Sequence, residues 1–376
     1  MTPTESPIPT ESPTSTDSPT PTDSPTPTES PTPTDSPTPT PDPSEFQYPP
    51  GTGESGLSAP LRRAHASRLS FNSFSVRRQN AFESFRADVT PERMSIQPDE
   101  YTANVFVGGG EYYLRGLVAG QRVYDFRQTV PNEFRRDRVV GGNLVSALAD
   151  GGEWDVQGVV QRDGEQLLQS IGDGVAAQAP FRNTSGVSRY FRDPFEVTDF
   201  VGDCFVAESG IVRRMTASVT AREEETGRSE ALQFRVETSD VGETSVARPG
   251  WLSTAEANAP VVSSEYTDNR RAVAVTLEDG TRLPGRGNLD TYDREGYYNA
   301  RLDQPIAVGD TVYVWKRTRE SAAVTSNPPT EEPVSSWGSN TRFNLRIGRI
   351  PLISGRSIGS GPRTRSLLTQ LLAVSI

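Results

Sequence analysis

The sequence is poor in the residues that most often carry catalysis and metal binding. Its 376 residues include one cysteine, Cys204, and one histidine, His65. A disulfide within the chain is therefore excluded, and a site built on cysteine and histidine would lack the further ligands or the orienting partner that such chemistry needs. We expect Cys204 to be a small core residue and His65 to lie on the surface of a helix.

Lysine and long apolar runs are also scarce. Lys316 is the only lysine, so arginine supplies every other positive side chain. Two causes stay open, adaptation to high salt and a GC-rich genome that favours arginine codons. The arginines form no basic run of the kind that follows phosphates, which argues against nucleic-acid binding. No run of about 18 apolar residues occurs, which argues against a transmembrane helix.

Negative charge is concentrated at the beginning of the chain, where positive charge is absent. The formal net charge is -11, yet eight of the 49 acidic residues precede residue 46, and the first basic residue is Arg62. These acids sit in a repeat of the type "SPTPTD", in which proline at alternate positions excludes helices and central strands. We expect residues 1–55 to form a disordered, low-complexity stalk of polyproline II type, at roughly 3.1 Å per residue. The remainder of the chain is close to neutral.

Two-residue periodicity begins near Ser70 and predicts antiparallel strands. Short runs such as "ESFRADV", "RMSIQP" and "EYYLRGLV" resemble a meander, and "VGGGEYY" is typical of a hairpin. The clearest alternation is in "IVRRMTASVTAR" and "ALQFRVE", where Ile211, Met215 and Val219 share one face. Such a sheet has one apolar face, which must be covered.

Two segments are predicted as the helices that supply this cover. In "SAPLRRAHASRL", Ser58 is a plausible N-cap and Pro60 lies in the first turn. The second helix is expected over Asp137–Leu148, ended by Gly151 and Gly152.

The two prolines of "GETSVARPGWLSTAEANAP" indicate a domain boundary, and short strands with Gly/Asp turns follow. We therefore predict a mainly β (α+β) fold: a curved antiparallel sheet packed on one or two helices, a small β-sandwich, and a disordered N-terminal stalk. The expected domains are 1–55 for the stalk, 56–257 for the sheet domain with its helices, 258–360 for the β-sandwich and 361–376 for a C-terminal tail.

The sequence does not favour an enzyme or a cofactor site. Paired carboxylates occur in "REEETGRSE" and "EDGTRLPGRGNLDTYDRE", but both segments read as polar turns, where solvated charges are usual. No glycine-rich phosphate loop follows a strand, and no "GxSxG" elbow occurs. We predict no enzymatic activity and no cofactor or metal.

Two stretches resemble a family of haloarchaeal surface lipoproteins. "LSAPLRRAHASRLSFNSFSVRR" is similar to the opening of that family, and "GIVRRMTASVTAREEETGRSEALQFRVETSDVGETSVARPGWLSTA" resembles its strand pair and "VGxTxVxxPxW" closure. The resemblance covers roughly residues 56–255. It implies a lipoprotein-carrier-like half-barrel with an apolar cavity, in an extracellular protein anchored by lipid at the cell surface.

The family carries an export signal ending in a lipidated cysteine, whereas Met1 leads directly into the stalk and Cys204 lies mid-chain. We expect such a signal and lipobox upstream of Met1, so that membrane contact is made only through this anchor.

The residues leave two functions open. The first is a surface module that binds a lipid or another apolar ligand, lined by period-two residues of the inward faces: Val105, Val107, Met215, Val219, Leu232, Phe234 and Val236. The same residues also suit a filled core, in which case the protein is structural or adhesive, with the β-sandwich contacting envelope components.

Glycosylation is the modification that the sequence indicates. Asn183, in "NTS", is an N-glycosylation acceptor pattern, and the Thr/Ser-Pro stalk resembles O-glycosylated spacers.

Overall fold

The computed structural model describes the chain between residues 46 and 357. Within that range, residues 54–55, 59, 81–83, 100–101, 119, 184–194, 268–269, 286, 293–296, 319–320, 331–332, 334, 338–341 and 348–349 are not described. Most of the predicted stalk and the whole predicted C-terminal tail thus lie outside the described residues.

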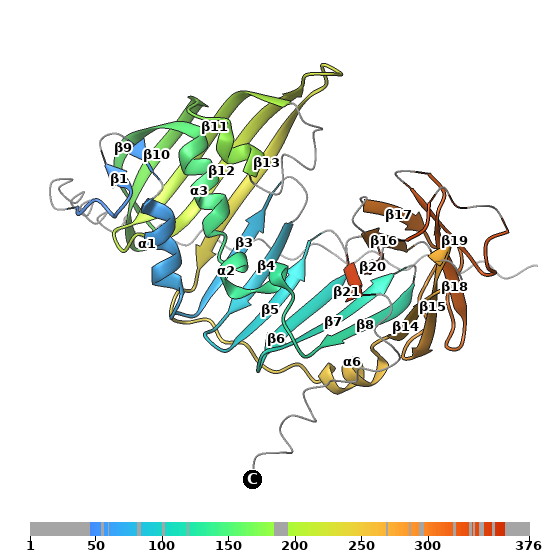
Figure 1. Ribbon diagram of the computed structural model, residues 1–376. Helices are drawn as coiled ribbons and strands as arrows, with labels where there is room; N and C mark the ends of the chain where they lie inside the picture. The colour runs from blue at the N-terminus through green and yellow to red at the C-terminus, as the bar shows by residue number, and fades with distance from the viewer. Residues whose placement is uncertain are drawn as a thin grey trace, which may run out of the picture. The chain divides into compact units, whose positions relative to one another are not determined.

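The dominant element is a curved antiparallel sheet of eleven strands, in the order β8-β7-β6-β5-β4-β3-β13-β12-β11-β10-β9 (Figure 1). It confirms the predicted curved sheet. Its strands are β3 (Phe74–Gln79), β4 (Ser84–Val89), β5 (Arg93–Pro98), β6 (Ala103–Gly108), β7 (Glu111–Val118), β8 (Gln121–Arg127), β9 (Gly152–Arg162), β10 (Glu165–Val175), β11 (Phe195–Ala207), β12 (Val212–Glu223) and β13 (Ser229–Ser239). A separate two-stranded sheet pairs β1 (Thr52–Gly53) with β2 (Gly56–Leu57).

The hairpins join neighbouring strands as their turn residues require. Gly109 and Gly110, between β6 and β7, both have positive φ, at 64° and 80°. Asp163 and Gly164, between β9 and β10, do as well, at 50° and 80°. Both turns match the type I′ geometry that suits tight hairpins. Strands β8 and β11 were not predicted, because their sequences carry charged or glycine residues among the apolar ones.

One face of the sheet is apolar through both halves, and we call it the inner face. The cross-strand register places Val236 opposite Met215 and, through β3 and β4, carries the same face to Val76 and Ala87. Further along it continues through Ile96 and Val105. Period-two alternation therefore sets the two faces apart, as the sequence indicated.

Helices cover the inner face of the β9–β13 half. They are α1 (Pro60–Leu69), α3 (Gly142–Gly151) and α4 (Ala179–Asn183). Leu61 of α1 and Leu144 and Leu148 of α3 share a buried cluster with Met215. No helix in the described part of the chain is long and apolar enough to cross a membrane.

The second predicted helix is broken in two. The structure has α2 (Arg136–Val139), preceded by the 3-10 turn η2 (Asn132–Phe134), and then α3, with Gly141 between α2 and α3 in the left-handed region at φ 80°. The prediction of one helix over 137–148 was therefore wrong. A glycine adopts that conformation without steric cost, so it allows a change of direction that residues with a side chain resist.

A β-bulge changes the predicted facing of the start of β12. The register between β11 and β12 shifts between Phe205 and Val206, so that Val212 joins the inner cluster while Ile211 joins another. The prediction that Ile211 shares a face with Met215 was wrong for this reason.

His65 is buried, so the prediction that it lies on the surface of a helix was wrong. It is fully buried, its Nε2 lies 3.2 Å from the Val140 carbonyl oxygen, and its Nδ1 accepts a hydrogen bond from the Val212 N–H at 3.2 Å. A neutral ring with the proton on Nε2 satisfies both partners. His65 thereby ties α1 to the end of α2 and to the start of β12. Burial, partly offset by the hydrogen bond to Val140, lowers the pKa of His65 to about 4.

Aromatic rings fill the space under α3 and α4, and glycines make room for them. The Trp154 and Phe200 rings meet edge to face at 5.5 Å, and Phe181 lies 6.2 Å from Phe200. A Cβ at Gly172 would lie 2.7 Å from Phe200 and 3.0 Å from Trp154. Trp154 Nε1 donates to the Leu148 carbonyl at 3.1 Å, which fixes the ring. This part of the interior is packed solid.

The opposite face is polar in the middle and apolar at the β6–β8 edge. There, Phe106, Tyr113 and Tyr124 cluster with Leu252 and Ala255 of α6 (Leu252–Asn258). The segment predicted as a domain boundary thus covers this edge. The lack of alternation in "NVFVG" and "EYYL" fits strands that are covered on both faces.

The C-terminal part contains two four-stranded antiparallel sheets, as the predicted β-sandwich requires. Val273 and Val314 of one sheet and Leu289 and Tyr298 of the other belong to one cluster of buried residues. Lys316 is buried there, with Nζ 4.8 Å from the centre of the Tyr298 ring. The sheets are β14 (Val261–Tyr266), β15 (Ala272–Asp279), β18 (Thr311–Lys316) and β19 (Ala322–Thr325), then β17 (Tyr297–Arg301), β16 (Asn288–Tyr292), β20 (Arg342–Ile347) and β21 (Ile350–Ser357).

Replacing Gly172 by alanine should destabilise the sheet domain. The added methyl group would meet the Phe200 and Trp154 rings at less than normal contact distance, and overpacking of this kind costs on the order of 1–3 kcal/mol. Thermal unfolding should show a midpoint several degrees below that of the wild type. Gly250→Ala is the matched control, because nothing lies within 4 Å of a Cβ at that position; equal midpoints for the two variants would contradict the packing argument.

Stability should fall as the pH drops from 6.5 towards 4. The pKa of His65 is lower in the folded chain (about 4) than in the unfolded one (6.5). The contribution of the buried neutral ring to the free energy of unfolding is therefore complete above pH 6.5, and it is lost at lower pH as protons bind the unfolded state. The loss amounts to roughly 3 kcal/mol. We compare denaturant unfolding of the wild type and of His65→Gln at several pH values. The glutamine amide keeps one donor and one acceptor but does not titrate, so the difference between the two proteins gives the pH dependence that is due to His65. Parallel pH curves for the two proteins would rule out His65 as the cause.

Candidate functional site

The seven residues predicted to line a ligand cavity all lie on the inner face and are buried. The structure does not gather them in one place. Five belong to the cluster under α1 and α3, namely Met215, Val219, Leu232, Phe234 and Val236, and two belong to the cluster of the β3–β8 half, namely Val105 and Val107. Whether a ligand lies between them stays a prediction, and the inner face is the candidate site for an apolar molecule.

The two halves of the inner face are covered differently. Over β9–β13 the cover is made of helices and of the Trp154, Phe181 and Phe200 rings. Over β3–β8 it includes η2 and α2: the Phe134 ring stacks on Tyr112 at 5.1 Å, and Val139 and Val140 belong to the same buried cluster. The segment 128–141, which contains only one 3-10 turn and one four-residue helix, is called the cover segment below.

Arg136 fastens the cover segment to the strands. Its Nη2 donates to the Leu69 and Asn72 carbonyls at 2.7 and 2.6 Å, and its Nη1 donates to the Thr90 carbonyl. The guanidinium carbon also lies 5.3 Å from the centre of the Phe74 ring. Burial lowers the pKa of Arg136. One cation thus satisfies three carbonyls that end α1 and the β4 strand.

A second arginine holds the same segment from the sheet. Arg78 points from β3 to the inner side, where its Nη1 donates to the Arg138 carbonyl at 2.7 Å and its guanidinium lies 5.8 Å from the Phe85 ring. In both cases an arginine side chain donates hydrogen bonds to main-chain oxygens. These contacts therefore do not depend on which side chains the acceptor residues carry. Sequence reasoning missed them because the acceptors are far away in the chain.

One end of the inner face is polar. Asp125 and Arg127 of β8 form an ion pair with 2.7 Å between Arg127 Nη2 and Asp125 Oδ2, and Arg127 lies 5.4 Å from the Tyr112 ring. Asp125 is almost fully buried. The chemistry of this end suits the polar end of an amphipathic molecule, whereas the middle offers only dispersion contacts.

Cys204 lies on the inner face of β11 and is fully buried, as predicted. Burial raises the pKa of its thiol, with a smaller contribution from Asp203. Such a thiol is a packing residue and a poor nucleophile.

Asn183, the predicted glycosylation acceptor, is the last residue of α4, and residues 184–194 that follow it are not described.

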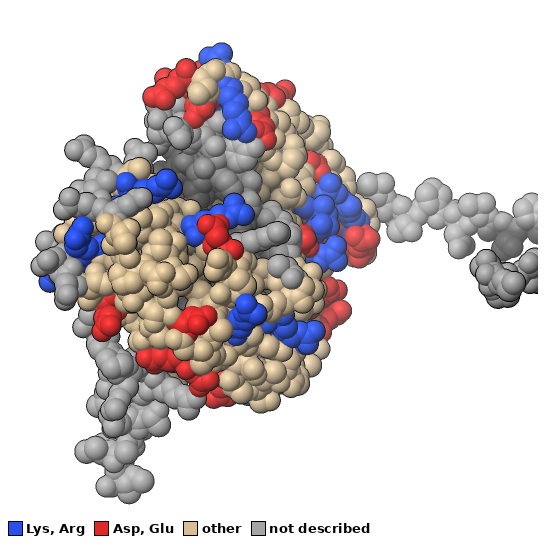
Figure 2. All heavy atoms as spheres, turned by 90° about the vertical axis from the view of Figure 1, so that its right-hand side faces the viewer, with Lys and Arg blue, Asp and Glu red and all other residues tan. Residues whose placement is uncertain are grey.

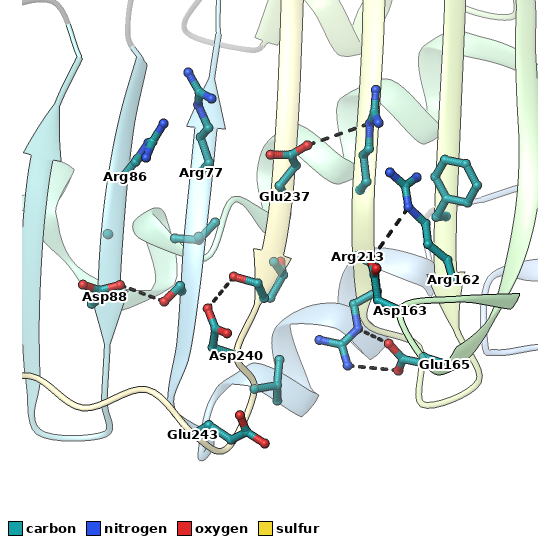
Figure 3. A pocket seen from close by; sticks show the side chains of 18 of the residues that line it. Arg77, Arg86, Asp88, Arg162, Asp163, Glu165, Arg213, Glu237, Asp240 and Glu243 are labelled. Atoms are coloured by element: carbon teal, nitrogen blue, oxygen red, sulfur yellow. Dashed lines mark hydrogen bonds and ion pairs between the residues drawn. The ribbon is translucent and has the colours of Figure 1, made fainter. Parts of the chain in front are cut away.

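A separate hollow of about 920 Å³ lies on the face opposite the helices. None of the seven predicted residues lines it. Its wall is rich in arginine and carboxylate side chains from β3, β4, β12 and β13 (Figure 3). The outward positions of these strands were recognised as polar, but the register that brings their arginines together was not visible in the sequence.

Comparison with known proteins gives a family and several distant structural likenesses. No curated protein matches the chain significantly. Among solved structures, the lipoprotein LppX from Mycobacterium tuberculosis is 14% identical with a TM-score of 0.31, covering 50% of this chain and 97% of its own. LprF from Mycobacterium bovis is 13% identical with a TM-score of 0.31, covering 51% and 95%. A putative outer membrane lipoprotein-sorting protein domain from Vibrio parahaemolyticus is 9% identical with a TM-score of 0.13, covering 51% and 94%.

The family match is confined to the first folded part of the chain. Residues 59–255 match the model of a family of unknown function, DUF7537. This range runs from the start of α1 through the eleven-stranded sheet to α6, and it excludes both the predicted stalk and the C-terminal sheets. The chain therefore belongs to the DUF7537 family.

Proposed function

We propose that the protein is a non-enzymatic envelope protein, displayed at the cell surface, whose inner sheet face holds an apolar, lipid-like ligand. The observation that carries this proposal is the difference between the two halves of the inner face. One half is packed solid by helices and aromatic rings, whereas the β3–β8 half lies under a short segment held by hydrogen bonds of Arg136 and Arg78 and by the buried Val139 and Val140. A segment with little helical structure of its own costs less to displace than a long packed helix.

The ligand would lie along the inner positions of β4 to β7. Ala87 and Ala103 provide small side chains there and Gly116 has none, beside larger apolar residues such as Ile96 and Leu114. An alkyl chain that replaces part of the cover segment would keep these residues out of water. Burial of apolar area contributes about 25 cal/mol per Å², so a chain of lipid length has enough surface to compete.

A second function fits one specific observation. Because all seven predicted lining residues are buried and none lines the hollow of about 920 Å³, the interior also suits a filled core. The protein would then be structural or adhesive, and its β-sandwich would contact a partner in the envelope. The experiments below separate these functions.

Lipid should be recovered from protein purified from its native membrane, and Ala103→Leu should reduce binding. The larger side chain occupies the inner face at a buried position of β6. We expect the affinity for a fluorescent fatty acid to fall about tenfold, corresponding to about 1.4 kcal/mol. Ala300→Leu, at an equally buried alanine of the β-sandwich, serves as the control for overpacking. Extracted lipid is measured by mass spectrometry.

Absence of lipid in the purified protein, together with no saturable uptake of the fatty acid, would leave the structural or adhesive function. Equal losses in Ala103→Leu and Ala300→Leu would point to general destabilisation instead. Thermal unfolding of both variants distinguishes these cases, since a specific block lowers affinity without a larger fall in midpoint than the control shows.

Display and modification of the stalk are tested on intact cells. Residues 1–55, rich in Thr, Ser and Pro, resemble a glycosylated spacer, and Asn183 carries the N-glycosylation pattern. Protease added outside intact cells should release the folded part by cutting in residues 1–55, and cuts near residue 258 would mark the proposed boundary of the β-sandwich. The released material should exceed its polypeptide mass and lose the excess on deglycosylation. Protection from the protease, or a mass equal to that of the polypeptide, would count against surface display or glycosylation respectively.

A further inference from the structure

The hollow opposite the helices is built mainly from the polar face of the eleven-stranded sheet. Residues of β3, β4, β5, β12 and β13 line it, together with the ends of β9 and β10, the turn between them, Phe205 of β11 and the segment 240–243. Its volume of about 920 Å³ is in the range of sites that hold a ligand of drug size. The inner face and this hollow lie on opposite sides of the same strands, and Val76 and Ala87, which the register assigns to the inner face, also border the hollow.

A row of charged residues crosses the hollow. Arg86 of β4 lies directly opposite Arg77 of β3, Arg77 lies opposite Glu237 of β13, and Glu237 lies opposite Arg214 of β12. Three guanidinium groups therefore flank a single carboxylate. Like charges directly opposite one another on neighbouring strands destabilise a sheet, so the Arg86 and Arg77 pair needs a compensating charge.

The available carboxylates do not supply that charge. Glu237 is shared, since its Oε1 is 2.5 Å from Arg235 Nη2 and 3.8 Å from Arg214 Nε. Arg77 reaches Asp99 only at 3.6 Å. Among the described residues, Arg86 has no ion pair. Counting Arg235, four cations share two carboxylates, which leaves a local excess of positive charge.

Unsatisfied donors point the same way. The Nε atoms of Arg77, Arg214 and Arg235 are buried and make no hydrogen bond with any described residue. The three side chains are still 36%, 38% and 33% exposed, so their outer ends reach solvent. Buried donors without acceptors cost free energy, and an oxyanion held by the outer ends of Arg77 and Arg214, which both line the hollow, would bring negative charge to this donor-rich cluster.

The other charges of the hollow are paired or lie at its other end. Glu165 accepts two hydrogen bonds from Arg213 at 2.6 and 2.9 Å, and the Arg162 guanidinium lies 5.1 Å from the Phe205 ring. In Figure 3, Asp88, Asp240 and Glu243 lie away from Arg86 and Arg77, toward the end of the strands. The hollow thus has a basic end and an acidic end. On the face of the molecule shown in Figure 2, by contrast, acidic and basic residues lie side by side.

We propose that the basic end of this hollow binds a tetrahedral oxyanion, phosphate or sulfate, carried as an ester on a larger polar molecule. Arginine donates in a planar fork that matches phosphate oxygens, and a shallow hollow of this size leaves room for the rest of the molecule beside the anion. The polar groups at the acidic end suit the hydroxyl or amino groups of a glycerol, sugar or amine. The ester is either a lipid head group or a soluble phosphate.

Binding is tested by calorimetry on the full chain with glycerol phosphate and with sodium sulfate, against sodium chloride at matched ionic strength. The wild type should bind saturably. Arg86→Gln and Arg77→Gln should each weaken binding about tenfold, because each removes a charge-assisted contact. Arg63→Gln, at an exposed arginine of α1, is the control and should leave the affinity unchanged.

A purely structural arginine gives a different result. Without anion, Arg86→Gln should unfold at the same or a higher temperature than the wild type, because the substitution removes a repulsion. A lower midpoint combined with unchanged anion affinity would overturn the proposal. So would equal weakening by Arg86→Gln and Arg63→Gln, which indicates unspecific screening.

Vesicles separate the two sources of the ester. Flotation with phosphatidylglycerol vesicles that depends on Arg86, without binding of free glycerol phosphate, supports a lipid head group. Binding of glycerol phosphate without flotation supports a soluble ester. If the wild type shows neither glycerol phosphate binding nor flotation, the proposal is overturned. This outcome leaves the proposed inner-face lipid site untouched, because fatty-acid uptake is measured separately.

Discussion

The pairing of β13 with β3 is the contact on which the rest of the sheet domain depends. Strands β3 to β8 and strands β9 to β13 are two series of neighbours in sequence, and five residue pairs, from Arg235 with Gln79 to Ser239 with Ser75, join them into one sheet. The joined residues are about 160 positions apart in the chain. Such a pairing costs loop-closure entropy before any contact is gained, so each half must bury apolar surface through its own hairpins for the closure to be favourable.

This seam carries two different chemistries at adjacent positions. Val236 faces the helices, while its neighbour Glu237 meets Arg77 and Arg214 on the other side. A shift of one residue would place the arginines against α3 and the valine in water, and burial of unpaired charge makes that register unfavourable. The apolar interior and the arginine-rich hollow therefore both favour the same register between β13 and β3.

The sequence shows each strand's sidedness but not its neighbours. Alternation in β12 and β13, the glycines of the β6–β7 hairpin and the buried Cys204 were predicted correctly, because each rests on local periodicity or on residue type. The bulge at Val212 and the burial of His65 were not, since both depend on a hydrogen bond between residues far apart in the chain. Arginine at the outward positions of β3, β4, β12 and β13 was a usable signal for the hollow, once the order of these strands is known.

The distribution of small and aromatic residues decides where an interior of this kind is able to open. Around β9 to β11 the glycines bring the backbone close to the Trp154 and Phe200 rings, so any opening there would remove aromatic contacts without replacing them. Over β3 to β8 the cover segment contributes the Phe134 ring on Tyr112 and the buried Val139 and Val140, whose contacts the proposed apolar ligand would have to replace. Arg136 remains bound to main-chain oxygens at the ends of α1 and β4, which do not belong to the inner face. In the proposed function, the Phe134 side of the segment would exchange one apolar neighbour for another, while Arg136 stays paired with these main-chain oxygens.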